Sequence, residues 1–300
     1  NGLSKILPPE DLTVIVNTGD DFVHLGLYIC PDIDTVTYTL AGINNLVSGW
    51  GRENETWEVH LERERNGFPV WFRLGDKDLA LHLERTRLIE GGRSLTEITQ
   101  KLTKALGVTH KILPMTNSIV RTMVITQEMG KLPFQEYFVK YRFQPRITSI
   151  QFEGIENAEI SQEVAEALIA CDAVVICPSN PFVSINPILS IPGFREFLKK
   201  KPVVAISPII GGSAVKGPAA KMLTERGREC SALGIARHYQ GLIDGIVIDQ
   251  IDQDLAPSIH ALGIAVSIEA TFMKTDSDKT SLALRTLAFS ETIKQQKKAG

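Results

Sequence analysis

Cysteine and histidine are scarce in this sequence, and their scarcity excludes two kinds of protein. The 300 residues include four cysteines, and no two of them form a C-x-x-C pair. So sparse a set excludes a disulfide-stapled secreted scaffold and predicts a thiol-reduced, cytoplasmic protein. The six histidines are scattered, with no two of them three or four residues apart. A zinc site is therefore not expected.

Long charged and long apolar runs are missing too. The net charge is −3 and the longest basic run is the three lysines centred on Lys200, so the chain has no basic footprint for the phosphates of nucleic acid. The apolar stretches are strand-sized and interrupted by Pro, Gly or Asp, far short of the roughly 20 residues that a membrane span needs. No signal-peptide pattern opens the sequence. We expect neither nucleic acid nor membrane as a partner.

The sequence does contain the pattern of a parallel sheet. Five short, β-branched and nearly continuous apolar segments are typical of buried parallel strands; they are residues 12–16, 173–177, 203–207, 245–249 and 264–268. Because helical patterns separate the last four, the sequence predicts an α/β protein with a Rossmann-like, doubly wound parallel sheet. Such a sheet normally opens with a strand and a Gly-rich turn. Neither precedes residue 12, so we expect the N-terminal strand to be missing.

The alternation of strand and helix patterns is interrupted between residues 50 and 154. Helical patterns cover residues 79–89 and 95–106, the second opened by the capping box Ser94-x-x-Glu97. A hairpin is expected to turn near Gly130. We therefore predict a Rossmann-like domain of residues 1–49 and 155–300, and an insertion of residues 50–154 that forms a lid or wall of the active-site crevice.

Four aspartates directly follow the first strand, in "TGDD" and "PDID": Asp20, Asp21, Asp32 and Asp34. Open α/β sheets bind ligands beyond the carboxyl ends of their strands. Carboxylates without softer ligands suit a hard cation such as Mg²⁺, which bridges phosphates and removes the repulsion between the acids. Any single aspartate could equally serve as a helix cap, but capping uses only one of the four.

Three other stretches have both a binding and a structural interpretation. "GGSAVKG" offers the N–H groups of Gly211 and Gly212 and the charge of Lys216 to a phosphate, although a Gly-Gly pair is often only a turn. "PSNP" could read a base or ribose edge with Ser179 and Asn180, or be a rigid turn. "WFRLGDKDLA" could bind a ligand or supply an ordinary aspartate cap, and the three tryptophans, Trp50, Trp57 and Trp71, could be core residues or stacking platforms.

Six segments in order resemble one known family, that of 2-phospho-L-lactate transferases, which act in coenzyme F-420 biosynthesis. They are "VNTGDDFVHLGLYICPDIDTVTYTLAG", "GWGRENETW", "WFRLGDKDLALHLERT", "LPFQEYFVKYR", "CPSNPFVSINPIL" and "SPIIGGSAVKGPAAKM". The resemblance implies an Mg²⁺-dependent enzyme that moves a phospholactyl or phosphoenolpyruvyl group from a guanosine diphosphate donor to the deazaflavin FO, giving coenzyme F-420-0 or its dehydro form and GMP. It also implies a homodimer. The Gly-Gly-x-Gly loop that normally opens the family has no counterpart among these 300 residues.

The resemblance and the residue chemistry together give a set of predicted site residues. Asp20 and Asp34 are the first candidates for metal ligands, with Asp21 and Asp32 as alternates, and an aspartate not fully engaged by metal is the candidate general base. The catalytic candidates are thus Asp20, Asp21 and Asp34. The expected donor contacts are Asn17, Thr18, Ser179, Asn180, Gly211, Gly212 and Lys216. The expected FO contacts are Asp20, His24, Trp71, Arg73, Asp76 and Phe134.

Two other functions compete with this one. An NAD-dependent oxidoreductase is disfavoured because no G-x-G-x-x-G follows any visible strand. A non-catalytic, nucleotide-sugar-binding regulator of the related gluconeogenesis-factor family shares the expected fold, and "WFRLGDKDLA" and "LPFQEYFVKYR" favour the transferase instead. The sequence leaves open whether the donor carries a lactyl, enolpyruvyl or glyceryl group.

Overall fold

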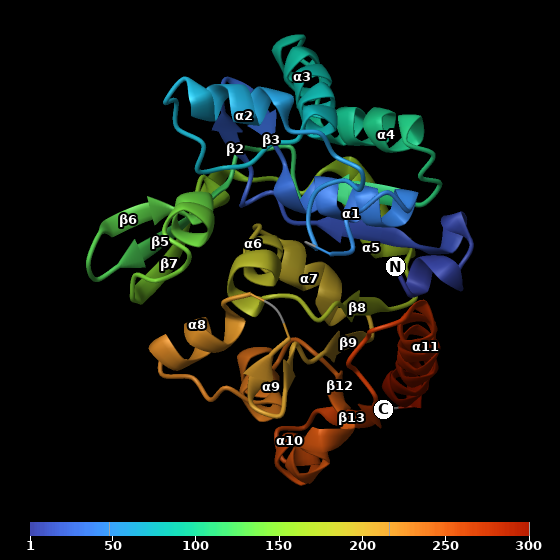
Figure 1. The fold of residues 1–300 in the computed structure, drawn as a ribbon. Helices are drawn as coiled ribbons and strands as arrows, with labels where there is room; N and C mark the ends of the chain where they lie inside the picture. Colours follow the sequence, from blue (N-terminus) through green and yellow to red (C-terminus); the bar gives the residue numbers. More distant parts are fainter. Residues whose placement is uncertain (48, 216, 300) are drawn as a thin grey trace. The chain divides into compact units, whose positions relative to one another are not determined.

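The computed structural model describes residues 1–47, 49–215 and 217–299 and has a mixed α/β architecture (Figure 1). Its contacts divide the chain into two compact units. The N-terminal unit comprises Pro9–Arg146 and Ile150–Val164, and the C-terminal unit comprises Asn1–Pro8, Ile147–Ser149 and the chain from Ala165 onward.

The C-terminal unit contains the parallel sheet that the sequence predicts. Its four strands lie in the order β13-β12-β9-β8, and every neighbouring pair is parallel. Their bounds are β8 Val174–Ile176, β9 Val203–Ile206, β12 Gly245–Asp249 and β13 Ala265–Glu269. Each lies within one or two residues of the segment predicted for it. The Rossmann-like α/β class is therefore confirmed for this sheet.

Apolar side chains cover both faces of the four-stranded sheet, as its continuous apolar runs require. On one face, Val204 and Val247 pack with Leu282 and Ile293 of α11, Asp276–Ala299, the red helix of Figure 1. On the other face, Ala205 is fully buried. The remaining helices of this unit are short: α6 Asn186–Leu189, α7 Phe194–Lys199, α8 Ala219–Glu225, α9 Ala232–His238 and α10 Ala256–His260.

Three small sheets of the described chain lie wholly or largely in the N-terminal unit. β1, Thr13–Val16, pairs in parallel with β4, Lys111–Pro114. β2, Phe22–His24, and β3, Leu27–Ile29, form a hairpin. β5, Arg121–Thr126, lies between β6, Gly130–Pro133, and β7, Ile147–Glu153, and the β5–β6 turn reaches Gly130 as predicted.

Four helices complete the N-terminal unit: α1 Pro31–Ala41, α2 Glu58–Arg65, α3 Asp76–Glu90 and α4 Leu95–Ala105. The predicted capping box of α4 is present, since Ser94 accepts from the N–H of Glu97 while the Glu97 carboxylate accepts from the N–H of Ser94. α5, Gln162–Ala170, follows, and the Ser161 hydroxyl accepts from the N–H of Val164 at 3.3 Å.

Two features differ from the sequence-based expectation. In the described part of the chain β1 pairs with β4 rather than with a strand of the four-stranded sheet. The compact units also fall at other boundaries than the predicted division at residues 49 and 155. The role of residues 50–154 as a lid or wall stays a prediction.

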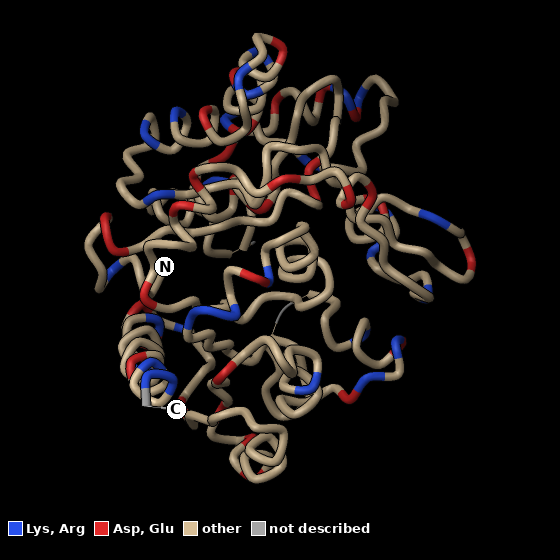
Figure 2. Tube along the Cα trace, turned by 180° about the vertical axis from the view of Figure 1, so that it is seen from behind, with Lys and Arg blue, Asp and Glu red and all other residues tan. Residues whose placement is uncertain are grey.

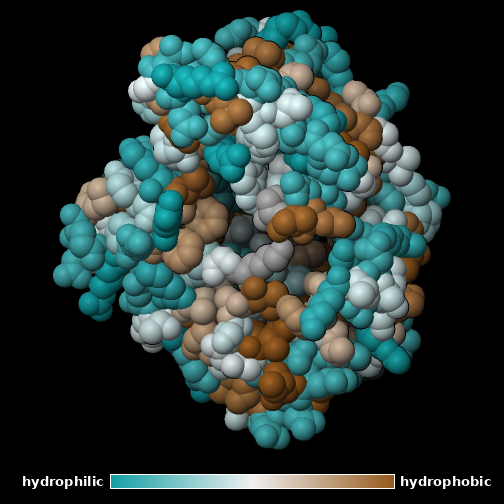
Figure 3. Space-filling view, in the orientation of Figure 1, coloured by the Kyte–Doolittle hydropathy of each residue, from teal (hydrophilic) through white to brown (hydrophobic). Residues whose placement is uncertain are grey.

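Along the described chain, lysine and arginine are interspersed with aspartate and glutamate (Figure 2). Apolar side chains reach the face shown in Figure 3 in several places, drawn in brown. Among the described residues, no helix combines the length and the apolar character that crossing a membrane requires.

Candidate active site

The predicted acidic stretch forms a buried turn between β1 and β2. Its side chains Asn17, Thr18, Asp20 and Asp21 are all 5% exposed or less. The Asn17 carbonyl oxygen Oδ1 accepts from the N–H of Gly19 at 2.8 Å, and the backbone of Thr18 accepts from that of Asp21 at 3.2 Å. These local hydrogen bonds are typical of an Asx turn, and they hold two carboxylates side by side away from water.

Asp20 and Asp32 form an electrostatically coupled pair. Asn17 Nδ2 donates to Asp32 Oδ2 at 2.9 Å, which ties the start of α1 to the turn. Burial, and next the negative charge of Asp32, raise the pKa of Asp20 well above its usual range. Burial also raises the pKa of Asp32. The Oδ1 atom of Asp20 is buried without a hydrogen-bond partner in the described structure.

Asp21 lies in the same turn and is 1% exposed. Neither of its carboxylate oxygens has a hydrogen-bond partner among the described residues. Burial raises its pKa well above the usual range, against the lowering influence of the Cys30 thiol and of the Arg85 and Arg121 charges. A buried carboxyl group without partners is destabilising for the fold, so such a group is commonly retained for function.

Asp34, a predicted metal ligand, forms an ion pair with Arg85. Its Oδ2 accepts from Nη1 of Arg85 at 3.1 Å, and its Oδ1 pairs with Nη2 of the same guanidinium. Both side chains are buried, at 2% exposure for Arg85 and 6% for Asp34. A two-point ion pair of this kind neutralises the carboxylate and occupies both of its oxygens. This ion pair makes Asp34 a less favourable ligand candidate than Asp20 or Asp32, and the choice of metal ligands stays a prediction.

The remaining acids fit a magnesium ion better than a softer metal. No three side chains of His, Cys, Asp and Glu in the described residues converge as a metal site. Mg²⁺ does not need such a cage, because it is usually held by one or two carboxylates while phosphates and waters fill its other positions. The unpartnered Oδ1 of Asp20 and the adjacent carboxylate of Asp32 supply oxygen donors of this type.

Two of the predicted FO contacts lie in one aromatic cluster at the β2–β3 hairpin. The rings of His24 and Trp71 meet edge to face with centroids 5.3 Å apart, and Phe22 and Phe72 flank them at 6.2 and 5.6 Å from Trp71. β2 begins directly after Asp21, so this cluster adjoins the acidic turn along the chain.

Three other predicted FO contacts have structural partners. The guanidinium of Arg73 lies 4.3 Å from the centroid of the Trp57 ring. Asp76 accepts from the N–H groups of Glu58 and Val59 at 3.0 and 3.2 Å and so caps α2. The sequence had suggested Asp76 as a cap for the helix that follows it. Phe134 is buried and stacks on Phe138 with centroids 5.5 Å apart, in a second aromatic group.

The predicted donor contacts of the C-terminal unit are engaged locally. Asn180 Oδ1 accepts from the N–H of Phe182 at 3.0 Å, which agrees with the interpretation of "PSNP" as a turn. The backbone N–H of Ser179 donates to the backbone carbonyl of Cys177. Gly211 and Gly212 form the turn between the two-residue strands β10, Ile209–Ile210, and β11, Ser213–Ala214.

Both turn glycines have positive φ, which the tight hairpin requires. The N–H of Gly211 donates to the Asp252 carboxylate at 3.1 Å. Lys216 lies outside the described residues.

Sequence reasoning missed the polar face of α3. Asp78, His82 and Arg85 are all buried, and Arg85 Nη1 contacts His82 Nδ1 at 3.0 Å as well as Asp34. Burial raises the pKa of Asp78 to about 6. The spacing i, i+4, i+7 was the available signal, because it places the three side chains on one face of a helix.

Comparison with known proteins identifies the family. A family model described as 2-phospho-L-lactate transferase CofD matches residues 1–282. A 2-phospho-L-lactate transferase of Methanosarcina acetivorans is 39% identical over 98% of this chain and 95% of its own length. A phosphoenolpyruvate transferase of Streptomyces griseus is 40% identical over 98% and 94%.

The fold has a more distant match among solved structures. A crystal structure of a UPF0052 family protein from Bacillus halodurans has a TM-score of 0.56 at 16% identity, covering 91% of this chain and 90% of that one. At 16% identity this similarity supports the fold alone. The matches at about 40% identity, which cover almost the whole chain, indicate the class of function. The chain belongs to the 2-phospho-L-lactate transferase CofD family, the transferases of coenzyme F-420 biosynthesis that its motifs resemble.

Proposed function

We propose that this enzyme transfers a phospholactyl or phosphoenolpyruvyl group from a guanosine diphosphate donor to the terminal ribityl hydroxyl of FO, with GMP as the leaving group and Mg²⁺ as cofactor. The observation that carries the proposal is the buried acidic turn, in which the negative charge of Asp32 helps to raise the pKa of Asp20 and Asp20 Oδ1 has no partner in the described structure. Phosphoryl transfer depends mainly on positioning and on neutralising phosphate charge. A carboxylate pair that lacks a counter-charge suits that demand.

Asp20 and Asp32 would hold the metal, and bound Mg²⁺ would supply charge neutralisation for the diphosphate. Asn17 orients Asp32 through its 2.9 Å hydrogen bond. Arg85 keeps Asp34 neutralised and out of the ligand set.

Asp21 is the candidate general base. Its carboxylate has no partner in the described structure, and its pKa is raised by burial, which makes it a better proton acceptor than an ordinary aspartate. In the reaction the FO hydroxyl oxygen forms a bond to the phosphorus distal to guanosine, the bond from that phosphorus to the bridging oxygen breaks, and the hydroxyl proton moves to Asp21.

The deazaflavin ring of FO needs a flat apolar surface, which Trp71 and His24 offer close in sequence to the acidic turn. Arg73 and Phe134 contribute to separate clusters, and their contact with FO stays a prediction from the sequence. The assignments of Thr18, Ser179, Asn180, Gly211, Gly212 and Lys216 to the donor stay predictions from the sequence.

Incubation of the purified protein with FO, each guanosine diphosphate donor and Mg²⁺ tests the proposal. We expect release of GMP with one phosphorylated deazaflavin product, and loss of that release in Asp20→Asn and Asp32→Asn. Asp11→Asn, an exposed aspartate of the same unit, is the matched control and should keep the wild-type rate. GMP release that persists in both variants would contradict the assignment.

Relatives named 2-phospho-L-lactate transferase and relatives named phosphoenolpyruvate transferase match this chain at nearly equal identity. Sequence identity alone therefore does not select the donor. A mass spectrum of the product formed from an equimolar mixture of donors would identify the preferred one.

A further inference from the structure

Three arginines of the C-terminal unit lie around one histidine. Arg226 and Arg228 follow the end of α8, and Arg195 belongs to α7. His238 is the last residue of α9, which Figure 1 labels. The guanidinium of Arg226 lies 5.3 Å from the centroid of the Phe182 ring, and the His238 ring meets the same ring edge to face with centroids 5.1 Å apart. Phe182 is 4% exposed, so a buried ring holds these two groups near each other.

The acids next to these arginines in the sequence are engaged by other cations. Each of them forms an ion pair elsewhere: Glu225 with Lys221, Glu229 with Arg237 and Glu196 with Lys199. In the described part of the chain, none of the three arginines forms an ion pair of its own. The cluster therefore carries three positive charges that no carboxylate pairs with.

The influence of the arginines on His238 indicates that their charges converge. Burial, and next the charges of Arg228, Arg195 and Arg226, lower its pKa to about 4. Burial, and next the charge of Arg228, also lower the pKa of Arg226. Nearby like charges disfavour the charged form of a group, and they repel one another wherever no anion lies between them. An anion at this place would relieve that repulsion.

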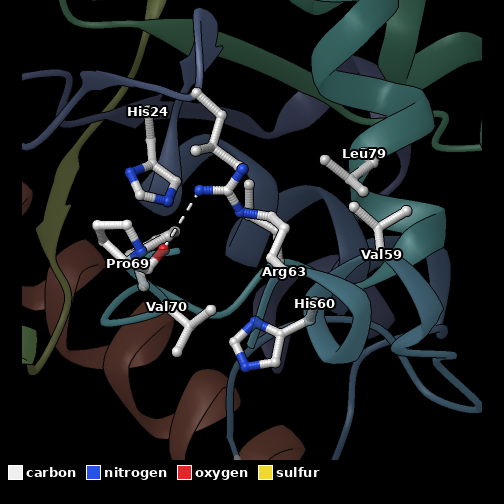
Figure 4. A pocket seen from close by; sticks show the side chains of 10 residues that line it. His24, Val59, His60, Arg63, Pro69, Val70 and Leu79 are labelled. Carbon is white, nitrogen blue, oxygen red and sulfur yellow. Dashed lines mark hydrogen bonds between the residues drawn. The ribbon is translucent and has the colours of Figure 1, made fainter. Parts of the chain in front are cut away.

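A single arginine without an ion pair is a different case. Arg63 of the N-terminal unit makes no ion pair with a described residue, and its guanidinium donates to the carbonyl of Pro69 at 3.3 Å beside His24 (Figure 4). A lone guanidinium near the surface keeps much of its hydration and has no other cation to repel. The convergence of three guanidiniums distinguishes the cluster on α7 and α8.

We propose that Arg195, Arg226 and Arg228 form a binding site for a phosphate group. Guanidinium forks match the oxygens of a phosphate, and hydrogen bonds between two charged partners are the strong ones. All three arginines are exposed, so an anion reaches them from solvent and needs no enclosed cavity. Nucleotides and free phosphates both offer this chemistry. The proposal does not depend on the transfer reaction, because none of the three arginines belongs to the predicted metal, donor or FO contacts.

Calorimetric titration of the full chain with inorganic pyrophosphate, at low salt and without Mg²⁺, tests the proposal. We expect the wild-type protein to bind, with a shift of the His238 ring resonance and a rise in the pKa of His238, because the bound anion offsets the charges of the arginines. Arg226→Gln and Arg228→Gln should each weaken binding by about tenfold, since each removes hydrogen bonds between charged partners. Arg285→Gln, at an exposed position of α11 in the same unit, removes an equal charge and should leave the affinity unchanged.

The same titration with GDP distinguishes the two sources of phosphate. GDP affinity that falls in Arg226→Gln and Arg228→Gln together with pyrophosphate affinity would assign the site to a nucleotide, and GDP affinity that stays constant would assign it to a free phosphate. Absence of pyrophosphate binding by the wild-type protein would overturn the proposal, and this result needs no variant to fold. Wild-type affinity in folded Arg226→Gln and Arg228→Gln, or an equal loss in Arg285→Gln, would overturn it as well.

Discussion

The four aspartates of the acidic stretch have the same side chain but different surroundings. Arg85 neutralises Asp34 at two points, while Asp20 is buried near the negative charge of Asp32, with one oxygen unpartnered in the described structure. A buried acid with a counter-charge stabilises its surroundings relative to the same acid alone, and a buried acid next to another acid destabilises them. Stability measurements on single variants can separate the two situations.

Asp20→Asn should stabilise the metal-free protein and Asp34→Asn should destabilise it. The first change removes an uncompensated charge, for a gain of about 1 kcal/mol in the free energy of unfolding and a rise in melting temperature of about 2–4 °C. The second leaves the Arg85 guanidinium buried without its partner, at a loss of about 3–5 kcal/mol. Thermal and urea denaturation at pH 8 in the presence of a chelator measures both.

The sign of the two changes is the decisive result. Destabilisation by Asp20→Asn as large as that by Asp34→Asn would mean that Asp20 also has a counter-charge in the metal-free protein.

His82 should make the protein less stable in acid. Arginine only donates hydrogen bonds, so His82 Nδ1 must accept from Arg85 at 3.0 Å and the ring must be neutral. Burial lowers the pKa of His82 to about 4, with Arg85 adding to the effect and Asp34 opposing it. Between pH 6.5 and 4 the unfolded chain therefore binds a proton that the folded protein does not. The stabilisation is complete above pH 6.5 and is lost as the pH falls toward 4, by about 3 kcal/mol in all.

Comparison with His82→Gln isolates this contribution. Glutamine can also accept from Arg85 and does not titrate, so the stability of the wild type relative to the variant should decrease from pH 7 to pH 4.5. A difference that stays constant over this range would show that His82 has an ordinary pKa in the folded protein.

At the scale of single elements, β12 and α11 pack closely at a glycine. A Cβ atom placed on Gly245 would lie 2.7 Å from Cε1 of Phe289 and 3.4 Å from Cδ1 of Ile293. Both side chains belong to α11, which covers this face of the sheet. The glycine thus allows the helix to approach the strand.

Gly245→Ala should lower the free energy of unfolding by about 1–3 kcal/mol, the usual effect of overpacking. The double variant Gly245→Ala/Phe289→Leu should recover part of the loss, because the shorter side chain makes room for the new methyl group. Urea denaturation of the two variants and of Phe289→Leu alone measures the coupling. Additive effects of the two substitutions would show that the alanine does not meet the Phe289 ring.

The elements that the sequence predicted well are those with local signals. The strands at residues 203–206 and 245–249 carry continuous β-branched runs, and α4 carries a capping box. The partner of β1 was not predictable in this way, because β4 lies almost a hundred residues later and neither strand encodes the pairing. The same holds for Asp34 and Arg85, which are 51 residues apart and meet only when α3 packs beside β3 and α1.

At the scale of the whole molecule, family membership rests on matches over almost the full length of the chain. The sequence motifs predicted this family correctly, because several of them recur in order. A homodimer, which the resemblance implies, stays a prediction that sedimentation of the purified protein would test.

The metal site is the central claim, and Mg²⁺ binding in the presence of GDP tests it most directly. Isothermal titration calorimetry should show one Mg²⁺ per chain for the wild type and for Asp11→Asn, and binding lost in Asp20→Asn and Asp32→Asn, because each removes a carboxylate that the ion needs. Binding at wild-type affinity in Asp20→Asn and Asp32→Asn would contradict the account and would place the ion elsewhere in the molecule.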